Sequence, residues 1–442
     1  MILIVGAGAV GSAIARDLAE TNEVRVIDRD PDRIDALTGD LDVAGVAGDG
    51  RSLSVLEEAG LDRAEVVVAS TDSDAANIMI CNAATEFGDP DTVARVKDLD
   101  VYRTWQGTDG GLGVDAMVAV DVVTAETVAR TLAVPGATAV ESFADGTVEI
   151  AEFELDADAP IVGSSVADVD RSPSVTFTAI FRDEGLVIPD GDTVFRAGDR
   201  VVVMGGPHGV SGFAETVGAE ELPNDEEVLV VGGDPLGYQI ARALETRGIN
   251  AEIVERDPDR VEQLRDELDD ATVTEADAIR VGGFDPAILD DARVVVGATD
   301  DDTNYLLTRL ARERGIERTA AVVRDLDVVE LFERTTDGVV VHPQDSLAGE
   351  ILGRLYDHGP ESVGVFEHDD AEVFEIVVDA DSVLTGQPLE TAVDRLPARC
   401  VVGAVIRGGS LDVPRGNHII QSGDRVFVFL ETSAAPEIAD LI

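Results

Sequence analysis

The residues with the clearest chemistry lie near the start of the chain, where glycines alternate with small apolar residues. The hexapeptide Gly6-Ala7-Gly8-Ala9-Val10-Gly11 follows a short Val/Ile run and opens a segment with helical periodicity. In that context Gly6 allows a tight turn, Gly8 lets the backbone approach a pyrophosphate, and Gly11 allows close helix packing. Amides at a helix N-terminus attract negative charge. The hexapeptide is therefore predicted to bind the phosphates of a nucleotide.

A carboxylate in the expected place extends this prediction to the sugar. Asp28 lies about 20 residues downstream, at the end of the second predicted strand. A carboxylate there accepts hydrogen bonds from a ribose diol and disfavours a 2′-phosphate, so NADP is not expected. NAD(H), ATP and ADP all carry a diol and phosphates, and the pattern leaves the choice among them open.

Polar residues also follow the third, fourth and fifth predicted strands. Gly48 and Asp49 follow the third strand, Ser70 and Thr71 follow the fourth, and Arg95 lies in the fifth. The carboxyl ends of parallel strands meet at one edge of the sheet, where open α/β folds bind ligands. The residues after the third and fourth strands are predicted to line the base and ribose pocket, and Arg95, with Lys97, is predicted to neutralise phosphate. The alternatives are ordinary turns and, for Arg95, an ion pair on an acidic surface.

The candidate catalytic groups are sparse. None of the five histidines falls in the first nucleotide-binding segment, and the sequence contains neither a metal-ligand spacing nor a Gly-x-Ser-x-Gly elbow. Hydride transfer usually needs a positioned acid or base beside the nicotinamide. A non-enzymatic role is therefore predicted, and an NAD-dependent oxidoreductase is the alternative from the enzyme class.

The elements that must position these residues alternate regularly. Short Val/Ile/Ala runs predict strands at 2–5, 24–27, 43–46, 66–69 and 93–96, and helical patterns lie between them at 10–19, 31–37, 53–59 and 75–87. This alternation predicts a Rossmann-like parallel sheet with helices on both faces. After about residue 134, alternating strands at 147–153, 176–181 and 200–204 predict a small β-rich α+β lobe.

The sequence contains two copies of this whole unit, a Rossmann-like lobe followed by a β-rich lobe. Val5–Gly11 recurs 226 residues later as Val231–Gly237, Ile27–Arg33 recurs 227 residues later as Val254–Arg260, and Ala197–Val201 recurs 225 residues later as Ser422–Val426. Such a period indicates a tandem duplication. The predicted lobes are Rossmann-like at 1–134 and 228–361 and β-rich at 135–220 and 362–442, with the polar segment 220–227 as linker.

The second copy departs from the first at the phosphate turn. Its pattern is Gly232-Gly-Asp234-Pro-Leu-Gly237, so a carboxylate replaces the glycine that approaches the pyrophosphate. Glu255 matches Asp28, and a ribose could still be held there. Dinucleotide binding is predicted for the first copy, and the second fingerprint is degenerate.

The amino-acid composition restricts the binding partners and the cellular compartment that can be expected for this protein. With 33 basic and 89 acidic residues the formal charge is −56, and Lys97 is the sole lysine. Nucleic-acid binding is excluded because it needs Lys/Arg clusters. The 45% hydrophobic content indicates a folded chain, and the charge predicts a salt-adapted source in which ions screen self-repulsion. Cys81 and Cys400 are predicted to be buried thiols in a reducing cytoplasm, and no membrane span is predicted.

The duplicated pattern resembles the TrkA family, the cytosolic regulatory subunits of Trk potassium uptake systems. The resemblance rests on the glycine turn and the Ile27–Arg33 motif, followed by Gly48-Asp-Gly50, Ala69–Asn77 and Ala94–Lys97, and on β-rich lobes that end in Gly-Asp-Arg-Val. It implies two regulator-of-potassium-conductance units, each able to bind NAD(H) or adenine nucleotides, in a homo-oligomeric ring beneath a potassium-translocating membrane subunit.

Carried onto this chain, the resemblance gives the family's ligand positions to Gly6 to Gly11, Asp28, Ser70, Thr71 and Arg95, with Glu255 and Thr299 as weaker counterparts. It implies a cytoplasmic, peripheral protein whose nucleotide state sets transport activity. A regulator of another transporter or channel is the remaining alternative, because the sequence offers no recognisable motif for the partner surface.

Overall fold

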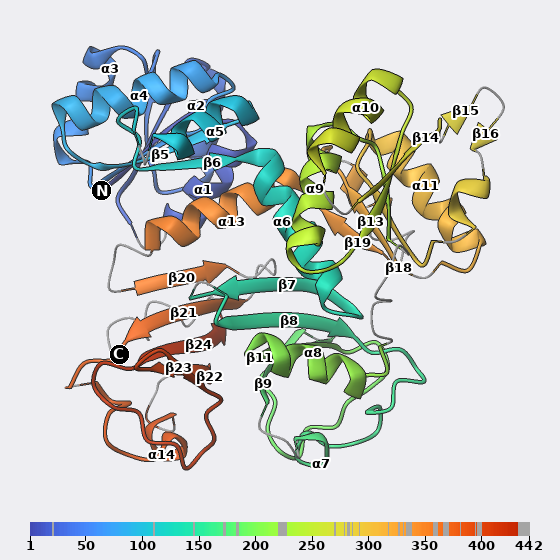
Figure 1. Cartoon of the computed structure of the whole chain (residues 1–442). Coiled ribbons are helices and arrows are strands. Elements are labelled where there is room, and N and C mark those ends of the chain that lie inside the picture. Colours follow the sequence, from blue (N-terminus) through green and yellow to red (C-terminus); the bar gives the residue numbers. More distant parts are fainter. Residues whose placement is uncertain are drawn as a thin grey trace. The chain divides into compact units, whose positions relative to one another are not determined.

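The computed structural model describes the chain in two compact units. One unit comprises Met1–Glu126 and Asp225–Leu355, and the other comprises Thr127–Asn224 and Tyr356–Ile442 (Figure 1). The described residues are 1–442 without 20–21, 109–110, 145, 171–173, 183–184, 220–227, 269–270, 278, 281–282, 285, 291, 317, 326–327, 330, 333–337, 357–360, 366–370, 381, 394, 396–399 and 432–442. The predicted linker 220–227 lies outside the described residues.

The first parallel sheet has six strands in the order β3-β2-β1-β4-β5-β6. Its strands are β1 Ile2–Val5, β2 Val24–Asp28, β3 Ala44–Ala47, β4 Val66–Ala69, β5 Asp91–Val96 and β6 Ala116–Ala119. The helices are α1 Ala9–Ala19, α2 Pro31–Asp40, α3 Leu53–Glu58, α4 Asp74–Phe87, α5 Leu99–Gly107 and α6 Val120–Ala133, with a short 3-10 turn at Leu61–Arg63. Every predicted strand and helix of residues 1–96 is present, with its ends shifted by a few residues.

The second parallel sheet repeats this order as β14-β13-β12-β17-β18-β19. Its strands are β12 Val228–Val231, β13 Ala251–Glu255, β14 Thr272–Glu275, β17 Val294–Gly297, β18 Arg318–Val322 and β19 Val339–Val341. Its helices are α9 Pro235–Thr246, α10 Pro258–Glu267 and α11 Asp301–Glu313, with a small hairpin of β15 Ile279–Arg280 and β16 Gly283–Phe284 and a 3-10 turn at Pro286–Leu289; α13 Pro343–Tyr356 follows β19 along the chain. The matching order shows that the sequence duplication is a duplication of fold.

Local chemistry fixes where the helices begin. The Asp30 carboxylate accepts a hydrogen bond from the backbone N–H of Asp32, and Pro31 occupies the first turn of α2. Asp257 and Pro258 repeat this arrangement at α10. A capping side chain satisfies an otherwise unpaired amide, and proline costs nothing at a position whose N–H has no helical partner.

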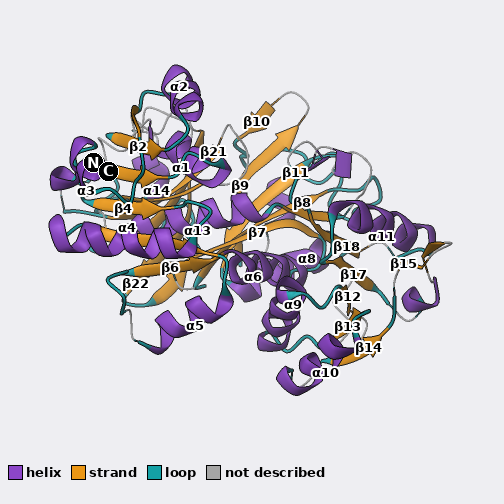
Figure 2. Cartoon of the chain, turned by 90° about the horizontal axis from the view of Figure 1, so that it is seen from above, coloured by secondary structure: helices purple, strands orange, loops and turns teal. Residues whose placement is uncertain are grey.

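The central strands of both parallel sheets are buried on both faces. Leu3, Val5, Ile27 and Val67 join one apolar cluster with residues of α3 and α4, and Figure 2 shows α4 lying along β4. Such a sheet needs continuous apolar runs, which is why Val and Ile dominate these strands. The predicted fold class is confirmed: two Rossmann-like lobes alternate along the chain with antiparallel β-rich lobes.

The second unit contains two antiparallel sheets, in the orders β10-β9-β11-β8-β7 and β20-β21-β24-β22-β23. The first comprises β7 Ala137–Phe143, β8 Val148–Glu154, β9 Val175–Arg182, β10 Gly185–Val187 and β11 Arg200–Gly205, with α7 Val166–Val169 and α8 Pro207–Thr216. The other comprises β20 Glu361–Val365, β21 Ala371–Val377, β22 Cys400–Arg407, β23 Ser410–Asp412 and β24 Arg425–Glu431, with α14 Leu389–Val393. Ile150, Met204, Val373 and Phe427 share one core, so the two sheets pack together within this unit.

The repeated Gly-Asp-Arg motif has a structural role in each β-rich lobe. Arg182 donates from Nε and a terminal nitrogen to the two oxygens of Asp199, at 2.7 and 2.8 Å. Arg407 forms the same two-pronged pair with Asp424, and this pair holds the pKa of the Asp424 carboxyl below its usual range. Both carboxylates are almost completely buried. A buried carboxylate needs such a partner because it has left water.

Removing one guanidinium is expected to destabilise this unit. Arg182→Ala leaves the buried Asp199 carboxylate without its guanidinium partner, while the backbone N–H of Arg196 still donates to it, and we expect the free energy of unfolding to fall by about 3 kcal/mol. The control is Arg63→Ala, which removes an exposed pair with Glu23 at 3.8 Å and should cost about 0–1 kcal/mol. Urea denaturation at constant high salt measures both. Equal losses in the two variants would contradict the structural role of the pair.

Two further predictions concern thiols and membrane spans. Cys81 and Cys400 are free and buried, as predicted, and burial raises the pKa of the Cys81 thiol to about 12. Among the described residues, no helix combines the length and the apolar character needed to cross a membrane.

Candidate functional site

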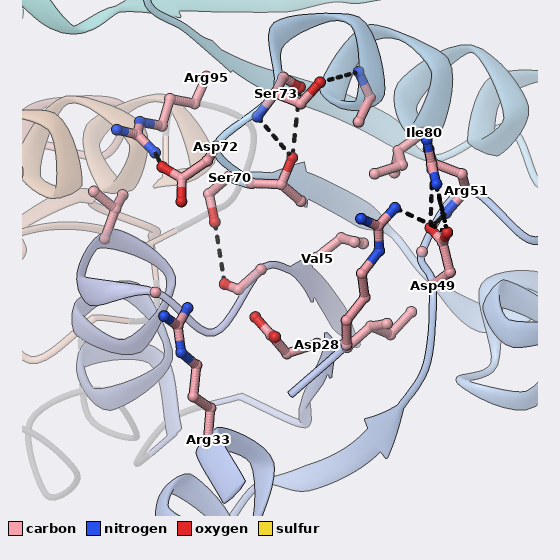
Figure 3. Close-up of a pocket in the computed structure, with 18 of the residues that line it drawn as sticks. Val5, Asp28, Arg33, Asp49, Arg51, Ser70, Asp72, Ser73, Ile80 and Arg95 are labelled. Atoms are coloured by element: carbon pink, nitrogen blue, oxygen red, sulfur yellow. Dashed lines mark hydrogen bonds and ion pairs between the residues drawn. The ribbon is translucent and has the colours of Figure 1, made fainter. Parts of the chain in front are cut away.

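A cavity of about 500 Å³ lies at the carboxyl ends of the first parallel sheet (Figure 3). The cavity lies at β1, where the strand order reverses: β2 and β3 lie on one side of β1, and β4 and β5 lie on the other. Ligands bind at this switch point in open α/β sheets. Every predicted site residue of the first copy except Ala7 and Gly11 lines the cavity, namely Gly6, Gly8, Ala9, Val10, Asp28, Gly48, Asp49, Ser70, Thr71 and Arg95.

Ala7 and Gly11 do not line the cavity, but their contacts fix the conformation of the glycine turn. The backbone N–H of Ala7 donates to Oδ2 of Asp28 at 2.6 Å. A Cβ on Gly11 would lie 1.8 Å from the carbonyl oxygen of Gly6, and Gly6 itself has a φ of +114°. Only glycine adopts that φ without strain, and only glycine lets the helix pack so closely on the turn. The turn is therefore set by Gly6 and Gly11.

Gly8 differs from these two glycines because it faces open space. A Cβ on Gly8 would meet a single atom within 4 Å, a terminal nitrogen of Arg33 at 3.8 Å. Its backbone has an ordinary negative φ. The fold alone does not require glycine at this position, and the free space beside its backbone is of the kind that a phosphate needs.

Asp28 connects the turn to the second strand. One carboxylate oxygen accepts from the Ala7 N–H and the other accepts from the Asp30 N–H at 2.9 Å. The side chain is half-buried and lines the cavity. Each carboxylate oxygen has a second lone pair, so Asp28 is held in place and can still accept from a ligand hydroxyl.

Arginines gather at the cavity, although the chain is strongly acidic. Arg29, Arg33 and Arg51 line it together with Arg95, and the first three are not among the site residues predicted from the sequence. Arg29 and Arg51 both donate to Asp49, at 2.8 and 2.7 Å, and their hydrogen bonds hold the pKa of that carboxyl well below its usual range. Arg29 and Arg51 could have been predicted, because each lies within two residues of a predicted site residue in the sequence. Arg33 has no such neighbour, and α2 places it at the cavity.

The β4 and β5 side of the cavity is braced by an asparagine. Oδ1 of Asn77 accepts from the backbone N–H of Thr71 at 3.0 Å and from its hydroxyl, and its Nδ2 donates to the carbonyl of Arg95 at 2.8 Å. Asn77 is completely buried. It fixes the ends of two adjacent strands, so Thr71 and Arg95 keep constant positions at the cavity wall.

Ion pairs also form on this side. Arg95 and Lys97 approach Asp72 at 3.6 and 3.0 Å, and Lys97 lowers the pKa of the Asp72 carboxyl. The ion pair that the sequence left as an alternative for Arg95 is therefore present. Arg95 nevertheless lines the cavity, and only 14% of its side chain is exposed.

One wall residue comes from the second copy. Gln344, in the first turn of α13, lines the same cavity although it lies far along the chain. No sequence signal marks it, because its place depends on where α13 packs in the folded unit.

The second copy has the same scaffold with a different surface. Gly232 has a φ of +110°, and a Cβ on Gly237 would lie 1.9 Å from the Gly232 carbonyl oxygen. Thr299 donates from its N–H and its hydroxyl to Asn304, as Thr71 does to Asn77. The turn and the strand ends are thus preserved, and Thr299 lies at the position that corresponds to Thr71.

The phosphate side of the second turn is altered. Glu255 is buried, and its carboxylate accepts from the backbone N–H groups of Gly233, Arg256 and Asp257. Arg260, the counterpart of Arg33, donates from Nε to the Gly233 carbonyl at 2.8 Å. Asp234 is exposed at the start of α9 and makes no capping hydrogen bond. Glu255 and Arg260 therefore stabilise the turn itself.

Comparison with protein families shows two alternating matches. The TrkA-N domain matches residues 2–118 and 228–343, and the TrkA-C domain matches residues 150–218 and 373–442. These matches follow the alternation of parallel and antiparallel sheets in the structure.

Curated relatives match over nearly the full chain. The Trk system potassium uptake protein TrkA homolog 1 of Methanosarcina mazei is 29% identical, with 99% of this chain and 98% of the relative covered. The Trk system potassium uptake protein TrkA of Halomonas elongata is also 29% identical, with 97% and 95% covered.

Solved structures share the fold. The GsuK channel aligns with a TM-score of 0.59 at 19% identity, over 100% of this chain and 78% of the channel chain. The GsuK channel bound to NAD aligns with a TM-score of 0.58 at 20% identity, with the same coverage.

Proposed function

Because the chain belongs to the TrkA family of Trk system potassium uptake proteins, we propose that it is a non-enzymatic regulatory subunit that senses NAD(H) or adenine nucleotides and gates a Trk-type potassium uptake system. The observation that carries this proposal is the first-copy cavity, in which open space beside Gly8, the Asp28 carboxylate and arginine side chains lie together. A related fold has been solved with NAD bound, as the GsuK channel.

We assign each part of the cavity to one part of such a ligand. The pyrophosphate would lie against Gly8 and the N-terminal amides of α1, where backbone dipoles favour negative charge. Asp28 would accept from the ribose diol, and the base would extend toward Gly48 and Asp49. Arg33 approaches Asp30 at 3.7 Å in an ion pair whose two side chains are both half exposed, so its guanidinium can turn toward the phosphates.

Binding would act by shifting a conformational equilibrium. A ligand with different affinities for two arrangements of the protein favours one of them by the difference in binding free energy, typically about 1–3 kcal/mol. A homo-oligomeric ring on the cytoplasmic face of the membrane, attached through a potassium-translocating subunit, would carry this shift to the transport path. Co-purification with a Trk-type membrane subunit and nucleotide-dependent potassium uptake in reconstituted vesicles test the partner.

We expect the isolated protein to bind NADH and ADP with micromolar dissociation constants, and Asp28→Ala to weaken both because both ligands carry the ribose diol. Loss of hydrogen bonds to a charged acceptor should raise each dissociation constant by roughly tenfold or more. Calorimetry in molar KCl measures this, with Asp62→Ala as the control, since Asp62 is exposed and does not line the cavity. Absence of heat with every nucleotide would contradict the proposed site.

A further inference from the structure

Asp49 and two arginines form one cluster in the wall of the first-copy cavity. Nε and a terminal nitrogen of Arg51 donate to the two oxygens of Asp49, at 3.1 and 2.7 Å. A terminal nitrogen of Arg29 donates to Oδ2 of Asp49 at 2.8 Å, and the backbone N–H of Arg51 donates to Oδ1 at 3.1 Å. All three residues line the cavity, and Figure 3 shows Asp49 and Arg51 on the side away from Arg95.

The four donors use the full accepting capacity of the Asp49 carboxylate. A carboxylate offers about four lone-pair positions, two on each oxygen. Oδ1 accepts from the backbone N–H and Nε of Arg51, and Oδ2 accepts from terminal nitrogens of Arg29 and Arg51. Asp28 differs, because each of its oxygens accepts one backbone N–H and keeps a second position. Asp28 can therefore accept from a ligand, whereas Asp49 holds two arginines in place.

Both guanidinium groups remain accessible to a ligand. The side chains of Arg29 and Arg51 are 60% and 47% exposed. Arg51 meets Asp49 with two nitrogens on two oxygens, a geometry that fixes the plane of its guanidinium. The flat face of a guanidinium stacks on nucleobases. The cluster therefore offers a ligand flat cationic surfaces, and its single side-chain acceptor is already occupied.

The strand order places this cluster where the base of a bound nucleotide would lie. β1, β2 and β3 are successive neighbours in the sheet, and neighbouring strands lie about 4.8 Å apart. Gly8 follows β1, Asp28 ends β2, and Asp49 follows β3. With the pyrophosphate at Gly8 and the ribose at Asp28, the next group of the nucleotide reaches Asp49 and its arginines.

We propose that Arg29 and Arg51 bind the base by stacking, without reading its edge, so that the site takes purine nucleotides as a class. Adenine carries an amino donor where guanine carries a carbonyl acceptor. A side chain that selects adenine by this difference must accept from the amino group, and Asp49 has no position left to do so. This inference rests on the proposed function and extends its ligands from adenine nucleotides to guanine nucleotides.

The first test compares nucleoside diphosphates by calorimetry in molar KCl. ADP, GDP and UDP share the ribose and the diphosphate, so differences among them come from the base. The dissociation constants of ADP and GDP should agree within about threefold, less than the effect of one typical hydrogen bond. UDP should bind more weakly, because a pyrimidine ring offers less area for stacking.

The second test changes the plane and keeps the charge. Lysine can still pair with Asp49, but its ammonium is a point charge without a flat face. Arg51→Lys should therefore raise the dissociation constants of ADP and GDP equally, by roughly two- to fivefold, and affect UDP less. Arg63→Lys is the matched control, since Arg63 is exposed and does not line the cavity. Thermal unfolding of ligand-free Arg51→Lys should match the wild type.

Other outcomes overturn the inference or the proposed function. If ADP binds more than about tenfold tighter than GDP, the effect of a hydrogen bond to a charged group, the edge of the base is read and stacking does not decide. Equal loss of all three ligands in Arg51→Lys, or no loss, would show that Arg51 does not bind the base. Tighter binding of NADPH than of NADH would assign the arginines to a 2′-phosphate. Failure of the wild-type chain to bind any nucleotide would instead overturn the proposed function.

Discussion

Gly8→Asp is expected to abolish nucleotide binding at the first copy and leave the fold intact. A Cβ at this position meets only a terminal nitrogen of Arg33, at 3.8 Å, and the backbone φ is ordinary. The carboxylate would therefore enter the cavity without disturbing the turn. There it would occupy the space for phosphate and repel its charge, so steric overlap and like-charge repulsion act together.

Stoichiometry is the measurement. We expect about one dinucleotide per chain for the natural protein, none for Gly8→Asp, and up to two for Asp234→Gly. Recovery in the second copy should be incomplete, because Pro235 follows Asp234, Glu275-Ala-Asp277 replaces Gly48-Asp-Gly50, and Arg260 remains bound to the Gly233 carbonyl.

Gly11→Ala is the contrasting control for Gly8→Asp. Its Cβ would lie 1.8 Å from the Gly6 carbonyl oxygen, so the turn itself must move and thermal stability should fall. Gly8→Asp should lose binding without that fall. Two equivalent dinucleotides on each natural chain would show that Asp234 points away from the phosphates and that the second turn is competent.

Removing salt is expected to unfold the protein or to dissociate the proposed homo-oligomer. A formal charge of −56 repels itself across the whole surface, and salt screens that repulsion with a Debye length of about 3 Å at 1 M but about 30 Å at 0.01 M. The exposed ion pairs contribute little in return. The compact state should therefore lose stability steadily as KCl is diluted.

Thermal unfolding and sedimentation across a KCl series measure this dependence. Sucrose in place of KCl is the control, because it favours compact states without screening charge. A variant with Asp35, Asp40 and Asp62 changed to Asn removes three exposed charges and should unfold at a lower salt concentration than the natural chain. A melting temperature that does not change between low and molar KCl would contradict the salt-adapted interpretation.

The individual strands and helices could be predicted from the sequence because each depends mainly on the residues within it and next to it. Short Val/Ile runs bounded by turns predicted the strands, and Asp30-Pro31 marked the start of α2, since a cap and a proline act within one turn. Gly6 and Gly11 were recognisable because their constraints, a positive φ and a 1.8 Å approach, come from neighbours in the same turn. The duplication could be read directly, because the motifs repeat at a nearly constant offset.

The elements between β5 and the β-rich lobe were harder to predict from the sequence. The sequence patterns do not predict α5, β6 or α6, which lie at Leu99–Gly107, Ala116–Ala119 and Val120–Ala133. The last two are contiguous, so no polar turn separates strand from helix. A continuous run of this kind does not show where one period changes to the other.

The sequence by itself determined the repeated fold, the glycine turn, the Asp28 carboxylate and the strand ends that form the cavity, because these follow from short-range spacing and from the meeting of parallel strands at one edge. Only the tertiary structure decided which arginines face the cavity, how Arg260 closes the second turn, and that α13 brings Gln344 to the first copy. The physical reason is distance along the chain: helix packing is set by the summed contacts of whole faces, and no local pattern in Gln344's neighbourhood records which turn it will meet.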